Sequence, residues 1–341
     1  MTNLRAAVIG LGSMGINHAR VYAEIKGVEL VAVTDTDAER ARSAGKRYGV
    51  PSYVDYREML SESTPTIVSV AVPTRQHCDV VTGALTAGCH VLVEKPIAAT
   101  VEEAQAMIDL AAKAERVLGV GHIERFNPVI MALRRAIEAG EIGDVLQIVI
   151  RRIGPKPNRP MDVGVFLDLA THDVDILCYV TGSSVTHLTS ESIRTGLTSH
   201  EDLGVGVLRL ANGSLGILIE NWLSPTKIRD VTVTGTGGML VADTLTQDLY
   251  QYDDDYESTQ WIAIQNLRGM AEGRMIRHRL QKGEPLRVEL EAFARSVIEG
   301  VPFPVTGNDG LRALELALRL RTASQTDKVA GASDEISPPS C

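Results

Sequence analysis

Apolar and polar positions along residues 4–121 alternate in blocks that predict strands and helices in turn. Short apolar runs are typical of strands buried on both faces, and the longer amphipathic segments between them are typical of helices. The predicted strands are 4–9, 28–34, 52–54, 67–72, 90–93 and 117–121, and the predicted helices are 14–25, 37–48, 56–62, 75–87 and 100–115. This order predicts an α/β domain over residues 1–122, with a mostly parallel, doubly wound sheet.

The pattern changes after residue 122, where helices become fewer and turn signals more frequent. Helices are predicted over 126–139, 163–180, 285–300 and 309–326, and strands over 145–152 and most of 185–243. The pair Asn212-Gly213 between two apolar runs is typical of a tight hairpin. Residues 123–328 are therefore predicted to form a second, α+β domain with a mainly antiparallel sheet, and residues 329–341 a disordered tail.

Composition narrows the class of protein. A chain of 341 residues suits two domains. Its four cysteines, which lack a C-x-x-C pair, argue against a zinc ribbon or disulfide scaffold and favour a reducing cytoplasm. We expect neither a signal peptide nor a membrane span. The net charge of −9 argues against nucleic acid as the main partner, so an anionic ligand would need a local group of cations.

A glycine-rich turn follows the first predicted strand and opens a helix. In Gly10-x-Gly12-x-x-Gly15 the first glycine makes the turn, the second lets backbone approach a pyrophosphate, and the third permits close helix–strand packing. Asp35 ends the second strand, where a carboxylate would bind the ribose hydroxyls and repel a 2′-phosphate; no Arg follows immediately, so NAD is favoured over NADP. The alternative is a glycine turn without a ligand. The predicted contacts from the loop are Gly10, Gly12, Ser13, Met14 and Gly15.

Two further strand ends carry candidate site residues. Ligands of doubly wound sheets bind beyond the carboxyl ends of the strands. The fourth strand is followed by Val72, Pro73 and Thr74, with His77 in the first turn of the next helix. These four residues are candidate cofactor contacts, although His77 could equally be a solvated residue at a helix start. The fifth strand ends in Glu94-Lys95-Pro96, which places Lys95 at the cofactor crevice; the alternative is a surface ion pair.

A polar stripe interrupts the apolar helix predicted at 163–180. Asp168, His172 and Asp175 are spaced i, i+4, i+7 and so share one face of a regular α-helix. Because an imidazole titrates near neutrality, His172 is suited to act as a general base, with Asp168 positioning the substrate or the ring. The same stripe could make a structural contact with the first domain. A metal site ranks last, because no third ligand is evident.

Four cations lie close together in residues 151–159 of an otherwise acidic chain. The basic residues are Arg151, Arg152, Lys156 and Arg159, and the first acid after them is Asp162. If they face one site, they would select an anion such as a diphosphate. The alternative is a solvated basic loop, rich in proline.

The motifs "GLGSMG", "VPTRQH", "EKP" and "DLATHDVD", in this order over about residues 4–325, closely resemble the Gfo/Idh/MocA family of oxidoreductases. The resemblance implies a Rossmann domain followed by an open-faced antiparallel sheet used for substrate binding and oligomerisation. It also implies that Lys95 lies near the nicotinamide and the reacting carbon, that the Lys95–Pro96 peptide is cis, and that Glu94 contacts the cofactor. His172 would be the catalytic base, with Asp168 near the substrate.

The substrate is narrowed by two segments. "RFNP", with Arg125 and Asn127, together with the basic segment, is similar to members of the family that act on nucleotide-diphosphate sugars such as UDP-N-acetylglucosamine. NAD-dependent oxidation of a secondary hydroxyl of such a sugar is the predicted activity. The alternatives are a dehydrogenase of inositol, another polyol or a simple sugar, and a non-catalytic dinucleotide sensor. The expected assembly is a homodimer or homotetramer. Predicted substrate contacts are Arg125, Asn127, Arg152, Lys156, Arg159, Asp168 and His172.

Overall fold

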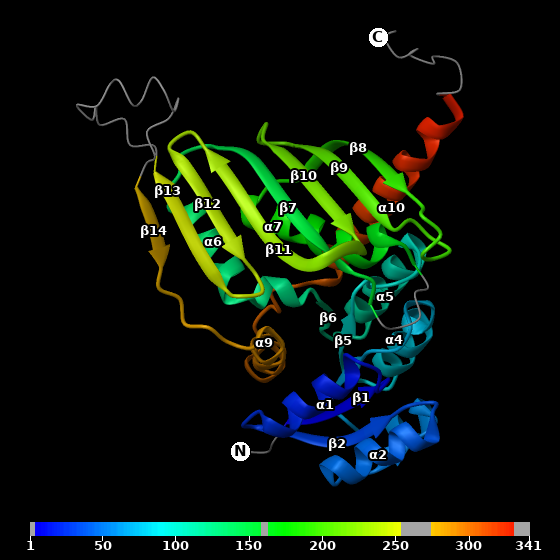
Figure 1. The fold of residues 1–341 in the computed structure, drawn as a ribbon. Helices are drawn as coiled ribbons and strands as arrows, with labels where there is room; N and C mark the ends of the chain where they lie inside the picture. The colour runs from blue at the N-terminus through cyan, green and yellow to red at the C-terminus, as the bar shows by residue number, and fades with distance from the viewer. Residues whose placement is uncertain (1–3, 158–162, 254–273, 331–341) are drawn as a thin grey trace, which may run out of the picture. The chain divides into compact units, whose positions relative to one another are not determined.

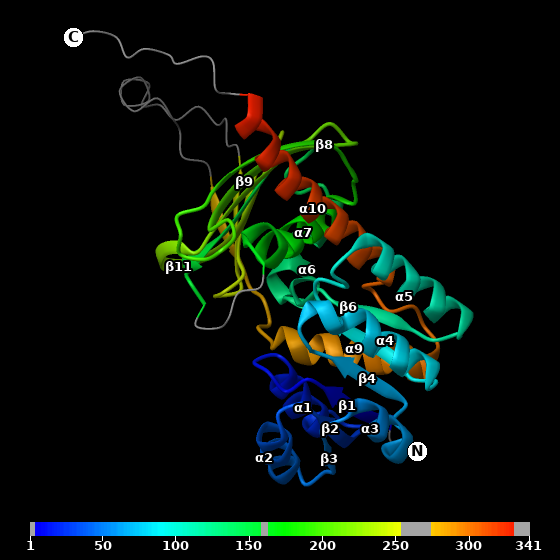
Figure 2. The ribbon, with the colours of Figure 1, turned by 90° about the vertical axis from the view of Figure 1, so that its right-hand side faces the viewer.

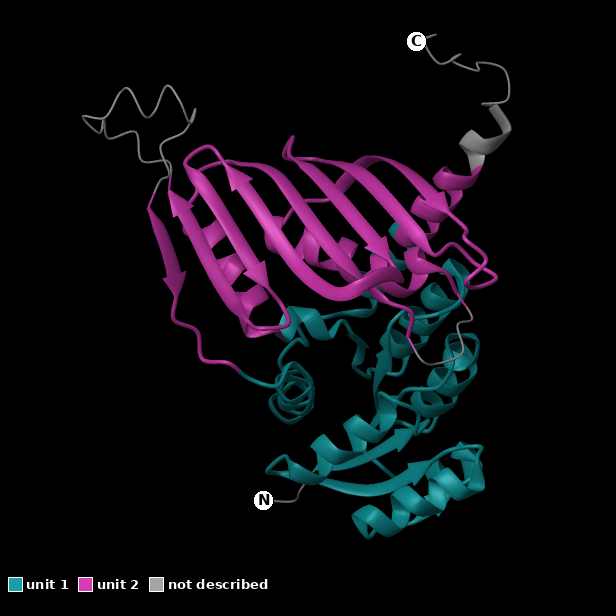
Figure 3. Ribbon diagram, in the orientation of Figure 1, with its two compact units in different colours: residues 1–126, 283–316 teal, residues 127–282, 317–341 magenta. Residues whose placement is uncertain are grey.

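The computed structural model describes residues 4–157, 163–253 and 274–330. The chain divides into two compact units, one of residues 1–126 with 283–316 and the other of residues 127–282 with 317–341 (Figure 3). The first boundary is close to the predicted one at residue 122. The predicted extent of the second domain, 123–328, is wrong for residues 283–316, which return to the first unit. The predicted tail lies almost entirely outside the described residues.

The first unit contains a six-stranded sheet in the order β3-β2-β1-β4-β5-β6, and every neighbouring pair is parallel. The strands are β1 (Leu4–Ile9), β2 (Val28–Thr34), β3 (Ser52–Tyr53), β4 (Ile67–Val70), β5 (His90–Glu94) and β6 (Leu118–Gly121). Strand order reverses between β1 and β4, which creates the crevice where such sheets bind ligands. The predicted doubly wound α/β fold is confirmed.

Helices cover both faces of this sheet. One group contains α1 (Gly15–Glu24), α2 (Ala38–Tyr48) and α9 (Pro285–Glu299), and the other contains α3 (Tyr56–Ser63), α4 (His77–Thr86) and α5 (Val101–Lys113) (Figures 1 and 2). Helix starts follow the capping residues in the sequence: the Asp37 carboxylate accepts from two backbone N–H groups of α2, and the Thr100 hydroxyl accepts from Glu103.

The returning segment completes the core of the first unit. Helix α9 contacts α1 and the short helix η2 (Ile123–Phe126). Phe303, which follows α9, stacks on Phe126 with ring centroids 5.7 Å apart and meets Phe293 edge-on at 5.3 Å. Gly119 of β6 leaves room for the Phe303 ring, since a Cβ there would lie 2.6 Å from it. The return is thus driven by burial of aromatic surface that β6 and η2 cannot cover themselves.

The second unit is built on an eight-stranded sheet in the order β14-β13-β12-β11-β7-β10-β9-β8. Its strands are β7 (Val145–Pro155), β8 (Val185–Ile193), β9 (Leu203–Leu210), β10 (Leu215–Asn221), β11 (Leu223–Gly235), β12 (Gly238–Asp243), β13 (Asp248–Asp253) and β14 (Met275–His278). Only the β7–β10 pair among these is parallel, so the predicted mainly antiparallel sheet is confirmed. The predicted Asn212-Gly213 hairpin joins β9 to β10, with Gly213 at φ +89°.

Helices lie on one face of this second sheet. They are α6 (Pro128–Glu138), α7 (Thr171–Thr181) and the later part of α10 (Gly307–Ala330) (Figures 1 and 2). The other face carries no helix among the described residues of this unit. None of the helices in the described part of the chain is long and apolar enough to cross a membrane.

Candidate active site

The glycine turn after β1 has the geometry of a dinucleotide loop. Gly10 has φ +88°, and a Cβ on it would lie 2.6 Å from the Ala71 carbonyl oxygen. A Cβ on Gly15 would lie 1.8 Å from the Gly10 carbonyl oxygen, so this glycine is required for packing the helix against the turn. By contrast, a Cβ on Gly12 would meet nothing within 4 Å. The loop therefore has open space at the position where backbone must approach a pyrophosphate.

Helix α1 begins directly after this loop and lacks a side-chain cap. Its N-cap residue, Met14, accepts no hydrogen bond through its side chain, and its first turn contains no acid. The first N–H groups and the helix dipole are thus oriented for an anion. Both observations fit the pyrophosphate of a dinucleotide.

Asp35 follows β2 and is buried between backbone donors. Its carboxylate accepts from the Leu11 N–H at 2.7 Å and from the Asp37 N–H at 2.9 Å, which fixes it beside the glycine turn. The Arg40 guanidinium donates to Asp35 at 3.2 Å and to Asp37 at 3.1 Å. Sequence reasoning missed Arg40, which lies one turn into α2 and not immediately after the strand.

The end of β4 and the segment after β5 are tied together by His77. The side chain of His77 is 1% exposed, so the solvated alternative is excluded. Its ring nitrogens lie 2.9 Å from the Pro96 carbonyl oxygen and 3.0 Å from that of Val72. Burial lowers the pKa of His77, against the opposing influence of the Val72 and Pro96 carbonyl oxygens. A neutral ring can donate to only one of these two oxygens at a time. Through these contacts His77 links the segment after β4, which includes Pro73 and Thr74, to the segment after β5.

Glu94 and Lys95 stand at the carboxyl end of β5, as predicted, and the Lys95–Pro96 peptide is cis. The Glu94 carboxylate accepts from His18 of α1 at 2.9 Å. Burial alone would raise the pKa of Glu94, but the hydrogen bond from His18 and the electrostatic influence of His18, Lys95 and His77 outweigh it and lower the pKa. Glu94 is therefore a mostly buried anion beside Lys95, with its side chain 11% exposed, and not half of a solvent-exposed pair.

The second unit carries the polar helix, which does not begin as a regular α-helix. Residues Phe166–Ala170 form a π-helical turn that runs into α7. Asp168 and Asp175 are buried, and His172, the second residue of α7, is partly exposed. Because a π turn contains more residues per turn than an α-helical one, the i, i+4 spacing does not place Asp168 and His172 in α-helical phase. Such turns are frequent at functional sites.

The four cations of the basic segment do not face one site, and that part of the prediction is wrong. Arg151 and Arg152 are neighbours on β7, so their side chains leave opposite faces of the sheet. Arg151 is half-exposed and pairs with Asp230, whereas Arg152 is buried and donates to Asp173 of α7 at 2.6 Å. Lys156 is exposed and contacts the Leu197 carbonyl oxygen at 3.3 Å. Arg159 lies outside the described residues.

The two residues of "RFNP" are buried in different units. Arg125 lies in η2 and forms a 3.0 Å ion pair with Asp309 of α10. Burial would raise the pKa of Asp309, but the Arg125 charge and hydrogen bonds from Thr306 and Arg125 lower it to about 2. Asn127 caps α6 by accepting from the Val129 N–H at 3.3 Å, and its amide donates to the Thr244 carbonyl oxygen at 3.1 Å.

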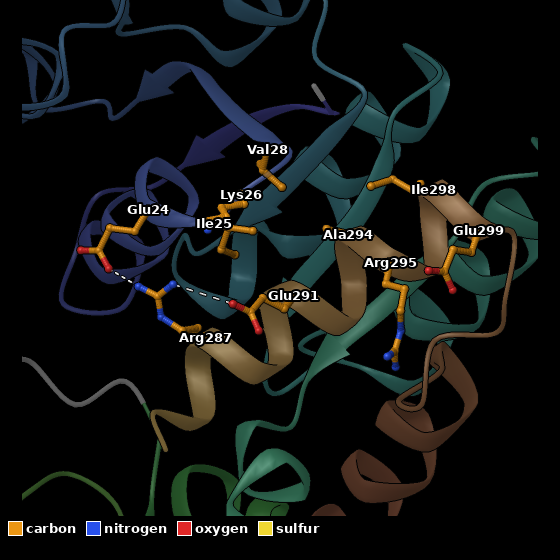
Figure 4. Close-up of a pocket in the computed structure, with 10 residues that line it drawn as sticks. All are labelled: Glu24, Ile25, Lys26, Val28, Arg287, Glu291, Ala294, Arg295, Ile298 and Glu299. Carbon is orange, nitrogen blue, oxygen red and sulfur yellow. Dashed lines mark hydrogen bonds and ion pairs between the residues drawn. The ribbon is translucent and has the colours of Figure 1, made fainter. Parts of the chain in front are cut away.

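The first unit also has a surface pocket of about 400 Å³, away from these loops (Figure 4). It is lined by Ile25 and Val28 at the start of β2 and by Arg287 and Ile298 of α9. The pocket therefore lies at the amino edge of the sheet, opposite the edge where doubly wound sheets bind ligands. Within the described ranges, no set of three or more His, Cys, Asp or Glu side chains is arranged to hold a metal ion.

Four features define the first unit as a dinucleotide-binding domain: the glycine turn, the uncapped helix, the fixed Asp35 and the switch in strand order. The same chain contains an α+β domain, in which a histidine lies where a π turn continues into an α-helix. A family model described as "Oxidoreductase family, NAD-binding Rossmann fold" matches residues 4–122, and the "GFO/IDH/MocA C-terminal domain" matches residues 130–241. The chain belongs to the Gfo/Idh/MocA oxidoreductase family. It is an NAD-binding oxidoreductase acting on CH–OH groups, which confirms the resemblance and the cofactor predicted from the sequence.

Several relatives match nearly the whole chain. UDP-N-acetylglucosamine 3-dehydrogenase of Acidithiobacillus ferrooxidans is 29% identical, covering 95% of this chain and 98% of its own. The solved structure of that enzyme superposes with a TM-score of 0.85 over 96% of this chain and 99% of its own. Myo-inositol 2-dehydrogenase of Thermotoga maritima is 30% identical, covering 92% and 94%. An Agrobacterium radiobacter oxidoreductase in complex with NAD⁺ shares the fold, with a TM-score of 0.82 at 20% identity over 96% of this chain and 97% of its own.

Proposed function

We propose that this chain catalyses NAD-dependent oxidation of a secondary hydroxyl of a nucleotide-diphosphate sugar, with UDP-N-acetylglucosamine as the leading candidate. The observation that carries the proposal is the end-to-end similarity, in sequence and in structure, to UDP-N-acetylglucosamine 3-dehydrogenase. The basic segment supports it less than its sequence indicated, because Arg151 and Arg152 are on opposite faces of β7 and each has an acidic partner.

A second candidate is oxidation of inositol or another free polyol. It is favoured by the similarity to myo-inositol 2-dehydrogenase, which is of comparable identity and coverage. Choosing between the two candidates requires a substrate assay. A purely dinucleotide-sensing role is disfavoured, because a sensor has no use for both Lys95 and His172.

In the proposed reaction, each residue acts on the substrate hydroxyl or the sugar ring. His172 removes the hydroxyl proton, and Lys95 donates a hydrogen bond to the same oxygen, which stabilises its developing negative charge. Asp168 holds the sugar ring. When bound, NAD would accept the hydride that leaves the carbon bearing this hydroxyl. Proposed substrate contacts are Arg125, Asn127, Arg152, Lys156, Arg159, Asp168 and His172.

The proposed cofactor contacts are the loop residues and strand ends of the first unit. They are Gly10, Gly12, Ser13, Met14, Gly15, Asp35, Val72, Pro73, Thr74, His77, Glu94 and Lys95. The uncapped α1 and the open space above Gly12 support the phosphate part of this set, and the fixed Asp35 carboxylate supports the ribose part.

We further propose a cytoplasmic homodimer or homotetramer that associates through the helix-free face of the second sheet. Directly paired residues form a partly exposed row across that face. The row consists of Val207, Ile217, Val149, Thr232, Val241 and Tyr250. Sedimentation would detect the oligomer, and Ile217→Lys should dissociate it if this face is the interface.

The substrate proposal is tested by assaying UDP-sugars, free sugars and inositols with NAD while following NADH absorbance. UDP-N-acetylglucosamine should give the highest kcat/KM, and a free inositol that surpasses every nucleotide sugar would contradict the proposal.

His172→Ala and Lys95→Ala should each lower kcat by ~10²-fold or more while NAD still binds. The matched controls, His187→Ala and Lys113→Ala, change exposed residues and should leave kcat unchanged.

A further inference from the structure

A chain of buried hydrogen bonds leads from the core of the first unit to Glu94. The Tyr22 hydroxyl lies 2.9 Å from the Ser69 hydroxyl, which lies 3.0 Å from Nδ1 of His18. Nε2 of the same ring lies 2.9 Å from the Glu94 carboxylate. Tyr22, Ser69 and His18 are each at most 1% exposed. Three side chains from α1 and β4 thus converge on the carboxyl end of β5.

The direction of this chain follows from counting hydrogens. Nε2 of His18 faces a carboxylate oxygen, so this nitrogen must carry the hydrogen. When the ring is neutral, Nδ1 is an acceptor, and Ser69 donates its only hydrogen to it. Ser69 in turn accepts from Tyr22, whose hydroxyl keeps its hydrogen because burial raises its pKa. Every hydrogen in the chain then points toward Glu94, and aligned hydrogen bonds strengthen one another in a medium of low dielectric constant.

A second buried carboxyl group lies close by and receives no such support. Glu289 of α9 is 0% exposed, and neither of its carboxyl oxygens has a hydrogen-bond partner among the described residues. Burial, followed by repulsion from Glu94, raises the pKa of Glu289 well above its ordinary range. Two neighbouring carboxyls are therefore held in different states: Glu94 is ionised and Glu289 is neutral.

The ionised state of Glu94 matters because of its neighbour in sequence. Lys95 is a cation at the carboxyl end of the same strand, and alone it would repel the positively charged, oxidised nicotinamide. A carboxylate fixed beside it offsets that charge. The reduced nicotinamide is neutral, so its binding depends far less on this balance.

We propose that Tyr22, Ser69 and His18 keep Glu94 ionised, and that the Glu94 carboxylate sets the preference of this site for oxidised over reduced cofactor. Glu94 is the specificity-determining group, and His18 is a positioning residue that acts through it. The inference rests on the proposed placement of Glu94 and Lys95 at the nicotinamide. The charged or titratable groups facing Glu94 are His18 from α1, Lys95 from its own strand, His77 from α4 and Glu289 from α9.

The test is to measure Kd for NAD⁺ and for NADH with the full chain, in the absence of sugar. Glu94→Gln keeps the shape of the side chain and removes its charge. It should weaken NAD⁺ binding by about tenfold or more while changing NADH binding by less than about threefold, as one lost charge interaction in a partly screened site predicts. Glu289→Gln is the matched control, since it replaces one neutral buried group by another, and it should leave the ratio of the two Kd values unchanged.

The role of His18 is tested by the pH dependence of the same ratio. In His18→Leu the Glu94 carboxyl loses its donor and its pKa should rise, so NAD⁺ binding should weaken as pH falls from 8 toward 6. The wild type should show no such weakening over this range. His18→Gln retains a donor and should restore much of the flat profile. Ser69→Ala interrupts the chain one step earlier and should shift the profile in the same direction, which keeps the test available if His18→Leu does not fold.

Three results would overturn the proposal. Equal weakening of NAD⁺ and NADH in Glu94→Gln would assign this residue to a part of the cofactor common to both forms. Unchanged affinities would remove Glu94 from the nicotinamide site. A flat pH profile in both His18→Leu and Ser69→Ala would show that Glu94 stays ionised without the hydrogen-bond chain. Since no sugar is present, failure to oxidise any nucleotide sugar does not bear on these results.

Discussion

Two opposite charges meet at the predicted ribose position of the cofactor site. Asp35 is fixed by the backbone of Leu11 and Asp37, and Arg40 is already hydrogen-bonded to it. In the proposed site Asp35 would bind the ribose hydroxyls, and it already pairs with the guanidinium that could otherwise bind a 2′-phosphate. We therefore propose that Asp35 sets the preference for NAD, and that Arg40 could bind a 2′-phosphate only when it is released from Asp35.

This arrangement predicts that Asp35→Ser alone shifts the preference from NAD toward NADP. The change removes the repulsion of the 2′-phosphate and releases Arg40 to bind it, so the ratio of kcat/KM values should move roughly ten- to hundredfold, as one charge-assisted contact is worth. The double variant Asp35→Ser with Arg40→Gln is the control and should lose most of the gain. Wild-type activity with NADP equal to that with NAD would contradict the assignment.

A second prediction at this scale concerns the neighbouring arginines of β7. Arg152 is paired with Asp173 in the interior, so Arg152→Ala leaves a buried carboxylate without this partner and should cost about 3–5 kcal/mol of unfolding free energy. Arg151→Ala breaks the exposed pair with Asp230 and should cost at most about 1 kcal/mol. Denaturant unfolding measures both. If Arg152→Ala keeps full stability and raises only KM, Arg152 serves the substrate and not the fold.

At the scale of one helix, α9 has the buried apolar face that the sequence predicts. It also buries a carboxyl group, that of Glu289, which the apolar pattern does not explain. Leu286, Leu290 and Phe293 are buried, as the apolar pattern predicts. Ile298, an apolar residue near the end of the same helix, is 62% exposed. Glu289 falls one turn after Leu286, on the buried face, and is fully buried. The sequence contained a signal for this position, because Glu289 has helical spacing that places it on the face of Leu286, Leu290 and Phe293. A charged residue on an apolar face indicates a functional or strained position.

Glu289 should make stability depend on pH in a defined sense. Its pKa in the folded chain is raised, so its contribution to stability is present below the ordinary pKa of Glu and is lost as pH rises. Glu289→Gln removes this loss and should raise the unfolding free energy at pH 7.5 by at most about 4 kcal/mol, the value for a group kept protonated over about three pH units. The gain should shrink toward pH 5. A gain that is equal at both pH values would contradict a neutral Glu289.

Helix starts and turns were predictable because their signals lie in neighbouring residues. Contacts between residues far apart in the chain were not predictable. The helix starts near Asp37 and Thr100 and the hairpin at Gly213 were predicted from the sequence because each depends on immediate neighbours. The opposite faces of Arg151 and Arg152 were also available, since adjacent strand residues alternate. The π turn before α7 was not, because nothing in residues 166–170 distinguishes it from an α-helical turn. The bond from His18 to Glu94 spans 76 positions and required the sheet order.

At the scale of the whole molecule, the order of elements predicted the fold class of each unit. It did not predict that residues 283–316 belong to the first unit. The pattern of 285–300 predicts a helix without specifying the surface that it covers. That surface is formed by α1, β6 and η2, more than 150 residues earlier in the chain. Long-range burial, not local propensity, assigns this segment to the first unit.

The same observation predicts how the chain can be divided. A fragment of residues 1–126 lacks α9 and Phe303 and should not melt cooperatively, because Phe126 and the surface over Gly119 lose their cover. Joining 283–316 to it through a flexible linker of about 20 residues, which spans roughly 25 Å, should restore a cooperative transition and NAD binding. The same fusion carrying Phe293→Asp is the matched control and should stay unfolded, because that ring is fully buried against Phe303. Circular dichroism melting checks all three chains, and a cooperative transition in 1–126 alone would show that the returning segment is not part of its folding unit.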